Sequence, residues 1–375
     1  MQNINAKTLA AIEVPVAPLN EQRRIVAKLE ALQARSRRAR AALDAVPPLL
    51  EKLRQSILAA AFRRDLTKDW RAKHRDVEAA SKLLERIRVE RRKKWEEAEF
   101  AKMKAKGKTP TDDKWKAKYK EPAPVDATGL PELPKGWCWA SLEQVTTRIT
   151  DGTHQPPPTT PSGVPFIGIR NVVGNQVDWE SVDNWVSPET HRVLTAACGP
   201  ERGDLLYMAV GATFGRAVEV AEWEPFVFQR HIALLKLVAA FHPSYAEAAL
   251  NSPRVFVQAQ RAARGAAQPT VTLGELGRFV LPIAPPAEQT IVAERIAHAL
   301  ERVGDMSRAS QRTADLLGTL NRATLAKAFR GELVPQDPSD EPAQAMLARL
   351  QVANDGTTPT KRRSTTIGSR VAPRG

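Results

Sequence analysis

Cysteine is almost missing from this sequence, since only Cys138 and Cys198 occur among its 375 residues. Two cysteines are too few for a disulfide framework or for a cysteine-rich zinc site. The six histidines include no pair at the spacing that metal ligands need. These absences exclude small disulfide-stapled domains and the common zinc-binding domains.

Long apolar runs are missing as well. No uninterrupted apolar stretch approaches the ~20 residues that a membrane span needs. Residues 1–11 lack the basic start and the apolar run of a signal peptide. We therefore expect a soluble, cytoplasmic protein.

Catalytic patterns are also absent. Gly107-Lys108-Thr109 is not a P-loop, because Lys102 stands where the first glycine of that motif should be. The segment 211–215 is too short for a dinucleotide fingerprint, and we interpret it as a turn at a strand end. The chain has no Asn-Pro-Pro or Asp-Pro-Pro tetrad of the kind that holds a target base in amino-methyltransferases. We expect no catalytic centre, no metal and no cofactor in this chain.

Positive charge, by contrast, is present in excess. The net charge of +14 favours a polyanionic partner such as nucleic acid. Residues 71–120 hold 18 basic and 9 acidic side chains, whereas residues 130–275 hold 11 basic and 14 acidic ones. Contact between nucleic acid and the second stretch must therefore depend on local basic patches.

The sequence also contains an internal repeat. Residues 9–66 align without a gap on residues 276–333, and 17 of the 58 positions are identical. The identities gather at the two ends of the repeat, where Glu21-Gln22 matches Glu288-Gln289 and Ala61-Phe62-Arg63 matches Ala328-Phe329-Arg330. Two copies around a long unmatched interval indicate two equivalent structural elements that flank a separate region, rather than a solenoid.

Each copy predicts an extended segment followed by a long helix. The extended segments are residues 12–16 and 279–283, whose internal proline is typical of an edge strand. Asn20 is the expected cap of the first helix, and Pro47-Pro48 should kink or restart it. The second helix lacks these prolines and should be straighter. A helix of ~40 residues would be ~60 Å long, and its exposed apolar stripe needs a partner helix.

Residues 70–122 form a highly charged segment with interspersed tryptophans, rich in helix formers over residues 85–106. It is either a solvated helix and linker or a contact region for DNA phosphates or a partner protein. Four prolines in residues 122–134 indicate a domain boundary after it.

Residues 135–281 alternate short β-type runs with Gly, Pro and Asn turns. The runs are residues 164–169, 205–210, 218–220 and 232–238, and residues 252–264 favour a helix. The predicted fold class is α+β, with one mixed α/β globular domain flanked by two long helices that pair as an antiparallel coiled coil. The predicted divisions begin with a short strand and the first long helix at 1–69 and a charged insert and linker at 70–129. The globular domain follows at 130–281, the second long helix at 282–340, and a basic, disordered tail at 341–375.

Several motifs in this order resemble one protein family. They are Leu133-Pro134-Lys135-Gly136-Trp137, Ile149-Thr150-Asp151-Gly152-Thr153-His154, Gly163-Val164-Pro165-Phe166-Ile167 with Arg170-Asn171, Gly203-Asp204-Leu205-Leu206, Val210-Gly211 with Gly215, Gln229-Arg230-His231 and Gln268-Pro269-Thr270. Together with the repeat, they resemble the specificity subunit of type I restriction-modification enzymes.

The resemblance implies a non-catalytic DNA reader. In that family a target-recognition domain reads one half of a bipartite site, and the paired helices set the gap between half-sites. Modification subunits dock on the helices and supply S-adenosylmethionine and adenine-N6 methylation. Restriction subunits add ATP-driven translocation and cleavage, with ATP and Mg on those partners.

The chain departs from the family pattern in one respect. A full subunit runs domain, helix, domain, helix, whereas this chain reads as helix, domain, helix, with residues 1–11 resembling the end of a further domain. We therefore expect a half-length form that forms a homodimer or pairs with another half-subunit. A natural half-subunit, a split gene and a fragment are all compatible with the sequence.

Basic and amide side chains of the middle domain are the candidate DNA contacts, because arginine pairs with guanine and asparagine or glutamine with adenine. They are Lys135, Arg148, His154, Gln155, Arg170, Asn171, Arg216, Gln229, Arg230, Arg261, Arg264 and Gln268. A lone histidine such as His154 is more often structural than a ligand, and Trp137 and Trp139 favour a role in the core.

The apolar stripes of the two helices are the candidate partner-binding positions. They are Ile25, Leu29, Leu53, Ile57, Phe62, Ile296, Leu300, Leu320, Leu325 and Phe329. We interpret the two Glu-Gln pairs as residues of the junction between strand and helix, and Phe62 and Phe329 as packing anchors. The alternative function is a coiled-coil scaffold that binds nucleic acid non-specifically through its charged segment.

Overall fold

A computed structural model describes residues 5, 8, 9, 11–63, 65–108, 110, 112–174, 176–211, 213–221, 225–263 and 269–355. The chain divides into two compact units, one made of residues 1–48 and 307–375 and the other of residues 49–306. Two helices, α3 (Val46–Ala61) and α11 (Pro286–Phe329), have residues in both units.

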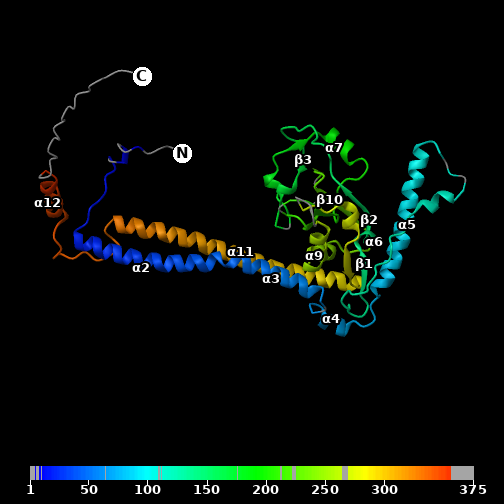
Figure 1. Ribbon diagram of the computed structural model, residues 1–375, viewed down its shortest axis with the longest axis horizontal. Helices are drawn as coiled ribbons and strands as arrows, with labels where there is room; N and C mark the ends of the chain where they lie inside the picture. The colour runs from blue at the N-terminus through cyan, green and yellow to red at the C-terminus, as the bar shows by residue number, and fades with distance from the viewer. Residues whose placement is uncertain are drawn as a thin grey trace, which may run out of the picture. The chain divides into compact units, whose positions relative to one another are not determined.

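The first unit contains α2 (Leu19–Asp44), the last part of α11 and α12 (Ala343–Asp355) (Figure 1). The cap of α2 is Pro18 rather than the predicted Asn20, which lies inside the helix. The fixed φ of proline suits entry into a helix, so no capping side chain is required. α2 stops at Asp44 and α3 starts at Val46, which confirms the restart predicted at the proline pair.

The same unit also corrects the expectation for the C-terminal tail. Ala343–Asp355 form α12 although a disordered tail was predicted from residue 341, and residues 356–375 lie outside the described residues. Leu29 of α2 and Leu325 of α11 line one shallow groove. Arg24 forms an ion pair with Asp340 at 2.5 Å, so the segment after α11 contacts the first turns of α2.

The second unit begins with α3 and continues through α4 (Lys68–Lys73), α5 (Ala80–Ala105) and the short 3-10 helix η1 (Lys114–Lys118). The charged segment is therefore helical, as its residues predicted. Trp95 holds η1 beside α5, because its ring lies 6.1 Å from that of Trp115 and 5.3 Å from that of Tyr119. Figure 1 shows α5 and η1 as an arm that returns on itself.

The main sheet of this unit is antiparallel and has the order β2-β10-β7-β8. Its strands are β2 (Thr146–Asp151), β7 (Leu205–Met208), β8 (Ala217–Glu219) and β10 (Ile232–Leu237). Every residue of β7 is buried, which explains why this strand is a continuous apolar run in the sequence. The β-type runs predicted in this domain all contain strands, whose ends differ from the predicted ones by one or two residues.

Smaller elements surround this sheet. The strands are β3 (Val164–Ile167), β6 (Trp185–Val186) and β9 (Val227–Phe228) in a second sheet, and the hairpin β4 (Val172–Val173) and β5 (Gln176–Val177). The helices are α6 (Leu142–Val145), η2 (Ile169–Asn171), η3 (Trp179–Ser181), α7 (Pro188–Thr195), α8 (Pro243–Leu250), α9 (Pro253–Ala262) and α10 (Leu273–Gly277).

The two ends of the inserted domain meet in one strand pair. β1 (Cys138–Ser141) runs antiparallel to β11 (Val280–Ile283), and β11 leads into α11. The predicted α+β class is confirmed. Along the described ranges, no helix is long and apolar enough to cross a membrane.

A buried carboxylate stabilises the junction between the domain and α11. Glu288 is fully buried, and its Oε1 accepts hydrogen bonds from Thr67 Oγ1 and Arg71 Nη1, both at 2.6 Å. Its Oε2 accepts a hydrogen bond from Trp137 Nε1 at 2.8 Å. The carboxylate also lies in the first turn of α11, where the helix dipole favours negative charge. One side chain thus joins α4, the start of the domain and α11.

The glutamine that follows this carboxylate has the same role in both repeats. Gln289 Nε2 donates to Ala284 O at 2.9 Å, and Gln22 Nε2 donates to Ala17 O at 2.7 Å. This symmetry confirms Gln22 and Gln289 as junction residues, and the hydrogen bonds of Glu288 confirm the same for that carboxylate.

The two phenylalanine anchors behave differently. Phe62 packs against Tyr245 in the core, with ring centroids 5.5 Å apart, as predicted. Phe329 is 62% exposed, so the prediction that it is a packing anchor is wrong. The residues that follow Phe62 enter α4, whose Arg71 contacts Glu288.

We predict that Glu288→Ala strongly destabilises the second unit, because it leaves an arginine, a hydroxyl and an indole N–H without their acceptor in a buried site. The free energy of unfolding should fall by about 3 kcal/mol or more, measured by urea titration. Glu294→Ala, at an exposed position of the same helix, is the matched control. A loss no larger than that of the control would contradict the prediction.

A second buried carboxyl predicts a pH dependence. Burial and the charge of Glu219 raise the pKa of Glu247 to about 7. The unfolded chain ionises this group near pH 4, so the folded state loses stability as pH rises from about 4 to about 7. Glu247→Gln should therefore raise the free energy of unfolding at pH 8 by ~1–3 kcal/mol and change it little at pH 4. Equal effects at both pH values would refute this, and exposed Glu143→Gln is the control.

Candidate nucleic-acid interface

Three loops meet at one edge of the main sheet. The pairing of Asp151 with Ala233 puts the end of β2 beside the start of β10. Ile232 pairs with Met208, so β7 ends at the same edge of the sheet. β8 begins there too, because its first residue, Ala217, pairs with Tyr207. The loops that leave this edge are residues 152–163, 209–216 and 229–231.

The second sheet brings a fourth loop to the same place. Gln229 N donates to Ile167 O at 3.1 Å, and Thr153 N donates to Phe228 O at 3.0 Å. The loop after β3 also contacts Arg216, whose Nη1 donates to Gly174 O at 3.4 Å. Residues 152–155, 168–174, 209–216 and 229–231 are called the loop edge below, and residues 175 and 212 are not among the described residues.

Two glycines allow these loops to approach one another. A Cβ on Gly152 would lie 2.0 Å from Phe228 O, so a side chain there would collide with the backbone of β9. Gly215 has φ +81°, and a Cβ on it would lie 2.8 Å from the ring of Phe256. The positive φ of Gly211 and Gly215 fits the turn predicted there, and the missing side chain of Gly152 lets the loop after β2 approach β9.

Six of the predicted DNA contacts lie on the loop edge at or near the surface. His154, Gln155, Arg170 and Arg230 are exposed, and Arg216 and Gln229 are half-buried. His154 Nε2 lies 3.0 Å from Asp151 Oδ2, and Arg170 pairs with Asp183. Asp151 and Asp183 thus hold His154 and Arg170 in place at the loop edge.

Asn171 is also in this region but has another role. It is 1% exposed, its Oδ1 accepts from Gly168 N, and its Nδ2 donates to Ser181 O. Both ends of the amide are used inside the protein. The prediction that Asn171 reads a base is therefore wrong, and it stabilises the loop after β3 instead.

The remaining candidates lie elsewhere. Lys135 precedes β1, Arg148 is on β2 and donates to Ala197 O at 2.7 Å, and Arg261 is on α9. All three are exposed. Arg264 and Gln268 lie outside the described residues.

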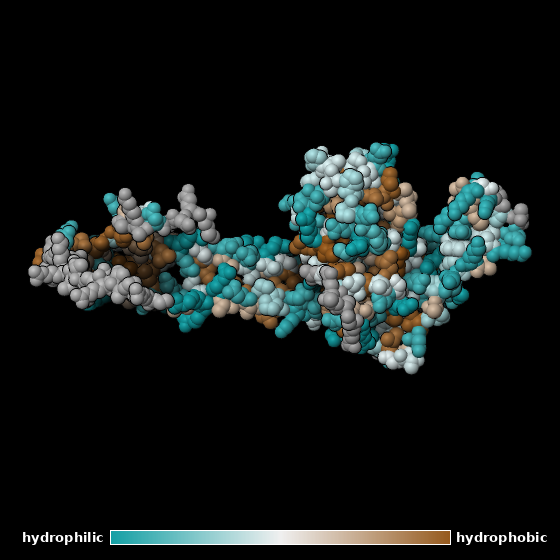
Figure 2. Space-filling view, turned by 45° about the horizontal axis from the view of Figure 1, so that its top comes forward, coloured by the Kyte–Doolittle hydropathy of each residue, from teal (hydrophilic) through white to brown (hydrophobic). Residues whose placement is uncertain are grey.

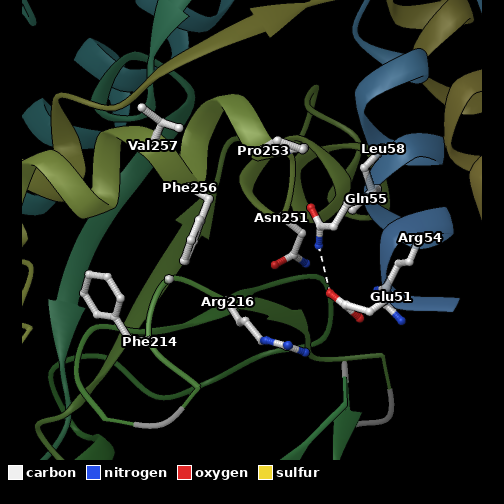
Figure 3. A pocket seen from close by; sticks show the side chains of 11 residues that line it. Glu51, Arg54, Gln55, Leu58, Phe214, Arg216, Asn251, Pro253, Phe256 and Val257 are labelled. Atoms are coloured by element: carbon white, nitrogen blue, oxygen red, sulfur yellow. Dashed lines mark hydrogen bonds between the residues drawn. The ribbon is translucent and has the colours of Figure 1, made fainter. Parts of the chain in front are cut away.

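A pocket adjoins the loop edge and contains an arginine that the sequence did not indicate. A cavity of about 450 Å³ lies between α3, the turn before β8 and the start of α9. Figure 3 shows Arg54 and Arg216 extending from opposite walls, with the carboxylate of Glu51 between them. Burial lowers the pKa of Arg54, Glu51 raises it, and the charge of Arg216 lowers it. Two guanidinium groups and the carboxylate of Glu51 thus line this pocket.

Arg54 was missed because it lies in the first repeat, far from the domain in sequence. Only the packing of α3 against the domain brings it to the pocket. Among the described residues, no group of three or more His, Cys, Asp or Glu side chains is placed to hold a metal.

The predicted partner-binding residues divide into three groups by their exposure. In the second unit, Ile296 is 4% exposed and lies in the core, and Phe62 and Leu300 pack against that core. These three contact the chain itself, so the structure does not leave them for a partner. Ile57 is half-buried, as are Ile25 and Leu29 in the first unit. Apolar side chains at the surface are Leu53, Leu320, Leu325 and Phe329.

Comparisons with known proteins give sequence relatives and a structural neighbour. No family model matches the chain. The specificity subunit of the type I restriction enzyme EcoBI from Escherichia coli is 23% identical over 91% of the chain and 63% of its own length. The specificity subunit of EcoDI, also from Escherichia coli, is 40% identical over 95 residues, which are 24% of the chain and 21% of that subunit.

One solved structure aligns with a TM-score of 0.55 and 22% identity, over 85% of the chain and 62% of the other chain. It comes from work on complex assembly and conformational transition of the type I restriction-modification system. The chain therefore spans less than two thirds of the length of EcoBI's subunit and of this neighbour. Along nine tenths of its length the chain resembles, in sequence, the specificity subunits of type I restriction enzymes, and its fold resembles that of the solved chain.

Proposed function

We propose that the chain is a non-catalytic DNA-recognition subunit that reads one half of a bipartite site within a type I restriction-modification complex. The observation that carries the proposal is the loop edge, where arginine and glutamine side chains from four separate loops converge. Base edges in the major groove are read by such groups, because arginine pairs with guanine and glutamine with adenine.

The charge distribution supports this proposal. The middle of the chain is net acidic, so binding through bulk charge is not expected there. Arg216 and Arg230 belong to the loop edge itself, and Arg54 adjoins it across the pocket. In a protein–DNA interface, side chains that contact phosphates fix the position of the protein on the duplex, and side chains that contact base edges specify the sequence. We assign Arg54 and Arg216 to phosphate and Arg230 with Gln155 to bases.

The long helices are proposed to pair as an antiparallel coiled coil that sets the distance between two half-sites. In the first unit, Figure 1 shows α2 and the end of α11 running in opposite directions, and the groove between them is lined by both helices. Leu320, Leu325 and Phe329 are at least 42% exposed on α11. An exposed apolar stripe on a helix is a binding surface for another protein.

We propose modification subunits as the proteins that bind these helices, and restriction subunits as further members of the complex. S-adenosylmethionine would be held by the modification subunits, and ATP and Mg by the restriction subunits. Pairing with another half-subunit or with a second copy would provide a second reader.

The second candidate function is a scaffold that binds nucleic acid through the arm of α5 and η1. Residues 71–120 carry the largest local excess of positive charge. Many of these charges are already paired within the arm, as in the ion pair of Arg92 with Glu96 at 3.1 Å. Lys104, Lys106 and Lys108 are exposed at its tip, and phosphate contacts there would be independent of sequence.

We predict that Arg216→Ala and Arg230→Ala each weaken binding of the full chain to a duplex selected from a random library. Binding should weaken about tenfold for each variant. The dependence of the affinity on salt concentration should become less steep for Arg216→Ala. Fluorescence anisotropy at several salt concentrations measures both effects. Arg278→Ala, at an exposed position near β11, is the control. Wild-type affinity in both variants would contradict the proposal and favour the scaffold.

We further predict that the purified chain transfers no methyl group from S-adenosylmethionine to DNA. Methylation of adenine should start when a modification subunit of the same system is added. Incorporation of labelled methyl groups into the selected duplex measures this. Methyl transfer by the chain alone, after removal of contaminating enzymes, would show that the non-catalytic assignment is wrong.

A further inference from the structure

The pocket beside the loop edge has an aromatic wall that the proposed DNA contacts do not use. Phe256 of α9 is 37% exposed, and its ring meets that of Phe214 edge-on, with centroids 6.5 Å apart. Figure 2 shows hydrophobic and hydrophilic surface side by side where the domain lies beside α3. Because the Phe256 ring lines the pocket and is open to solvent, it can stack on a flat ring of a ligand.

The opposite wall is polar and comes from α3. Gln55 Nε2 donates to Glu51 Oε1 at 3.1 Å, which orients the carboxylate (Figure 3). Glu51 is exposed, and among the described residues its carboxylate accepts no other hydrogen bond. It therefore has positions left for the N–H donors of a ligand.

The two guanidinium groups of the pocket also have unused donors. Arg54 is half-buried, yet within the described ranges it donates no hydrogen bond, and only burial and nearby charges act on it. Arg216 donates one long hydrogen bond, to Gly174 O at 3.4 Å. With Glu51, these side chains give the pocket a net charge of +1. A ligand that carries both an anionic group and N–H donors complements this set.

The walls of the pocket are fixed by contacts of their own. Asn251 Nδ2 donates to Ala217 O at 2.8 Å, and its Oδ1 accepts from Ala217 N at 2.9 Å, which fixes the residue after Arg216. On α3, Leu58 is 1% exposed and belongs to the main core. A pocket that is already formed loses little entropy when a ligand binds.

We propose that this pocket binds a guanine nucleotide. The base stacks on Phe256, and Glu51 accepts hydrogen bonds from its N1–H and N2–H groups. Arg54 and Arg216 bind the phosphate. No other DNA base offers two neighbouring N–H donors on one edge, so a carboxylate favours guanine. The volume of about 450 Å³ lies within the range of ~300–1,000 Å³ that is usual for ligand sites.

Simpler ligands leave part of the pocket unused. Inorganic phosphate suits the arginines but is repelled by Glu51, whereas a metal cation suits Glu51 but is repelled by the arginines. A free base leaves both guanidinium groups without an acceptor. Of these ligands, the nucleotide alone matches the aromatic ring, the carboxylate and the two arginines.

The nucleotide can come from bound DNA or from solution. Arg216 belongs to the pocket and to the loop edge, so a nucleotide of a bound duplex can reach the pocket once it leaves its stack. A free guanine nucleotide needs no DNA. The pocket chemistry is the same for both, and the inference rests on the proposed DNA-recognition function only for the first source.

The test is isothermal titration of the full chain with GMP, AMP, CMP, TMP and inorganic phosphate in separate runs. GMP should bind about tenfold more tightly than the other nucleotides. Glu51→Gln should weaken GMP binding about tenfold and remove the preference for guanine, because an amide has one acceptor oxygen instead of two. Phe256→Leu keeps an apolar side chain without the ring, so it should weaken all four nucleotides about tenfold. Gln260→Ala, at an exposed position of α9, is the control.

A second measurement identifies the source of the nucleotide. A fluorescent guanine analogue replaces each guanine in turn in a duplex selected from a random library. A change of its fluorescence on binding at one position, absent with Phe256→Leu, means that DNA supplies the nucleotide. No change at any position means that the pocket takes a free nucleotide. If the chain binds no duplex, the proposed function fails, and the GMP titration still decides the inference.

Three results of the titration would overturn the inference. The first is the lack of saturable GMP binding at millimolar concentration. The second is binding of inorganic phosphate as tight as that of GMP, which would reduce the pocket to an anion site. The third is a Glu51→Gln variant that binds all four nucleotides like the wild type.

Discussion

The hydrogen bonds around Glu288 are the constraint on which the second unit depends. A buried carboxylate is tolerated only when its oxygens are fully bonded and its charge is compensated. Here an arginine, a hydroxyl and an indole meet that requirement, and they come from α4 and from the start of the inserted domain. The junction therefore forms only when the end of the first repeat, the domain entry and the second helix are all in place.

This junction explains how a domain can be inserted between two helices while the start of the second helix stays folded against the rest of the unit. β1 and β11 pair beside it, so the chain enters and leaves the domain at one point. The loop edge lies on other strands, and there Asn171 is structural while arginines and glutamines lie at or near the surface. The junction and the loops proposed to contact DNA are thus different parts of the chain, as is common for binding loops on a rigid scaffold.

Much of the fold could be predicted from the sequence, because local patterns decide it. The alternation of apolar runs and turns located β7, β8 and β10 of the main sheet but missed β2, and the paired prolines located the break between α2 and α3. The cap was misplaced at Asn20 because proline can start a helix without a capping side chain. Phe329 was misassigned because identity between repeats does not ensure that both copies have something to pack against.

The candidate site was predictable only in part. Side-chain chemistry selected Arg216 and Arg230, and the sheet register then placed them on one edge. The same chemistry selected Asn171, although its amide is buried and fully bonded. Arg54 could not be found at all, since no local pattern relates α3 to a loop about 160 residues later in the sequence.

The sequence by itself determined the repeat, the two long helices, the middle domain and the resemblance to a family, because each is recorded in local spacing or in motif order. Only the tertiary structure decided which polar groups are satisfied and which side chains share a surface. Burial and hydrogen bonding depend on contacts between residues that are distant in the chain. That is why Glu21 and Glu288, which occupy equivalent positions of the repeat, differ so much in their surroundings.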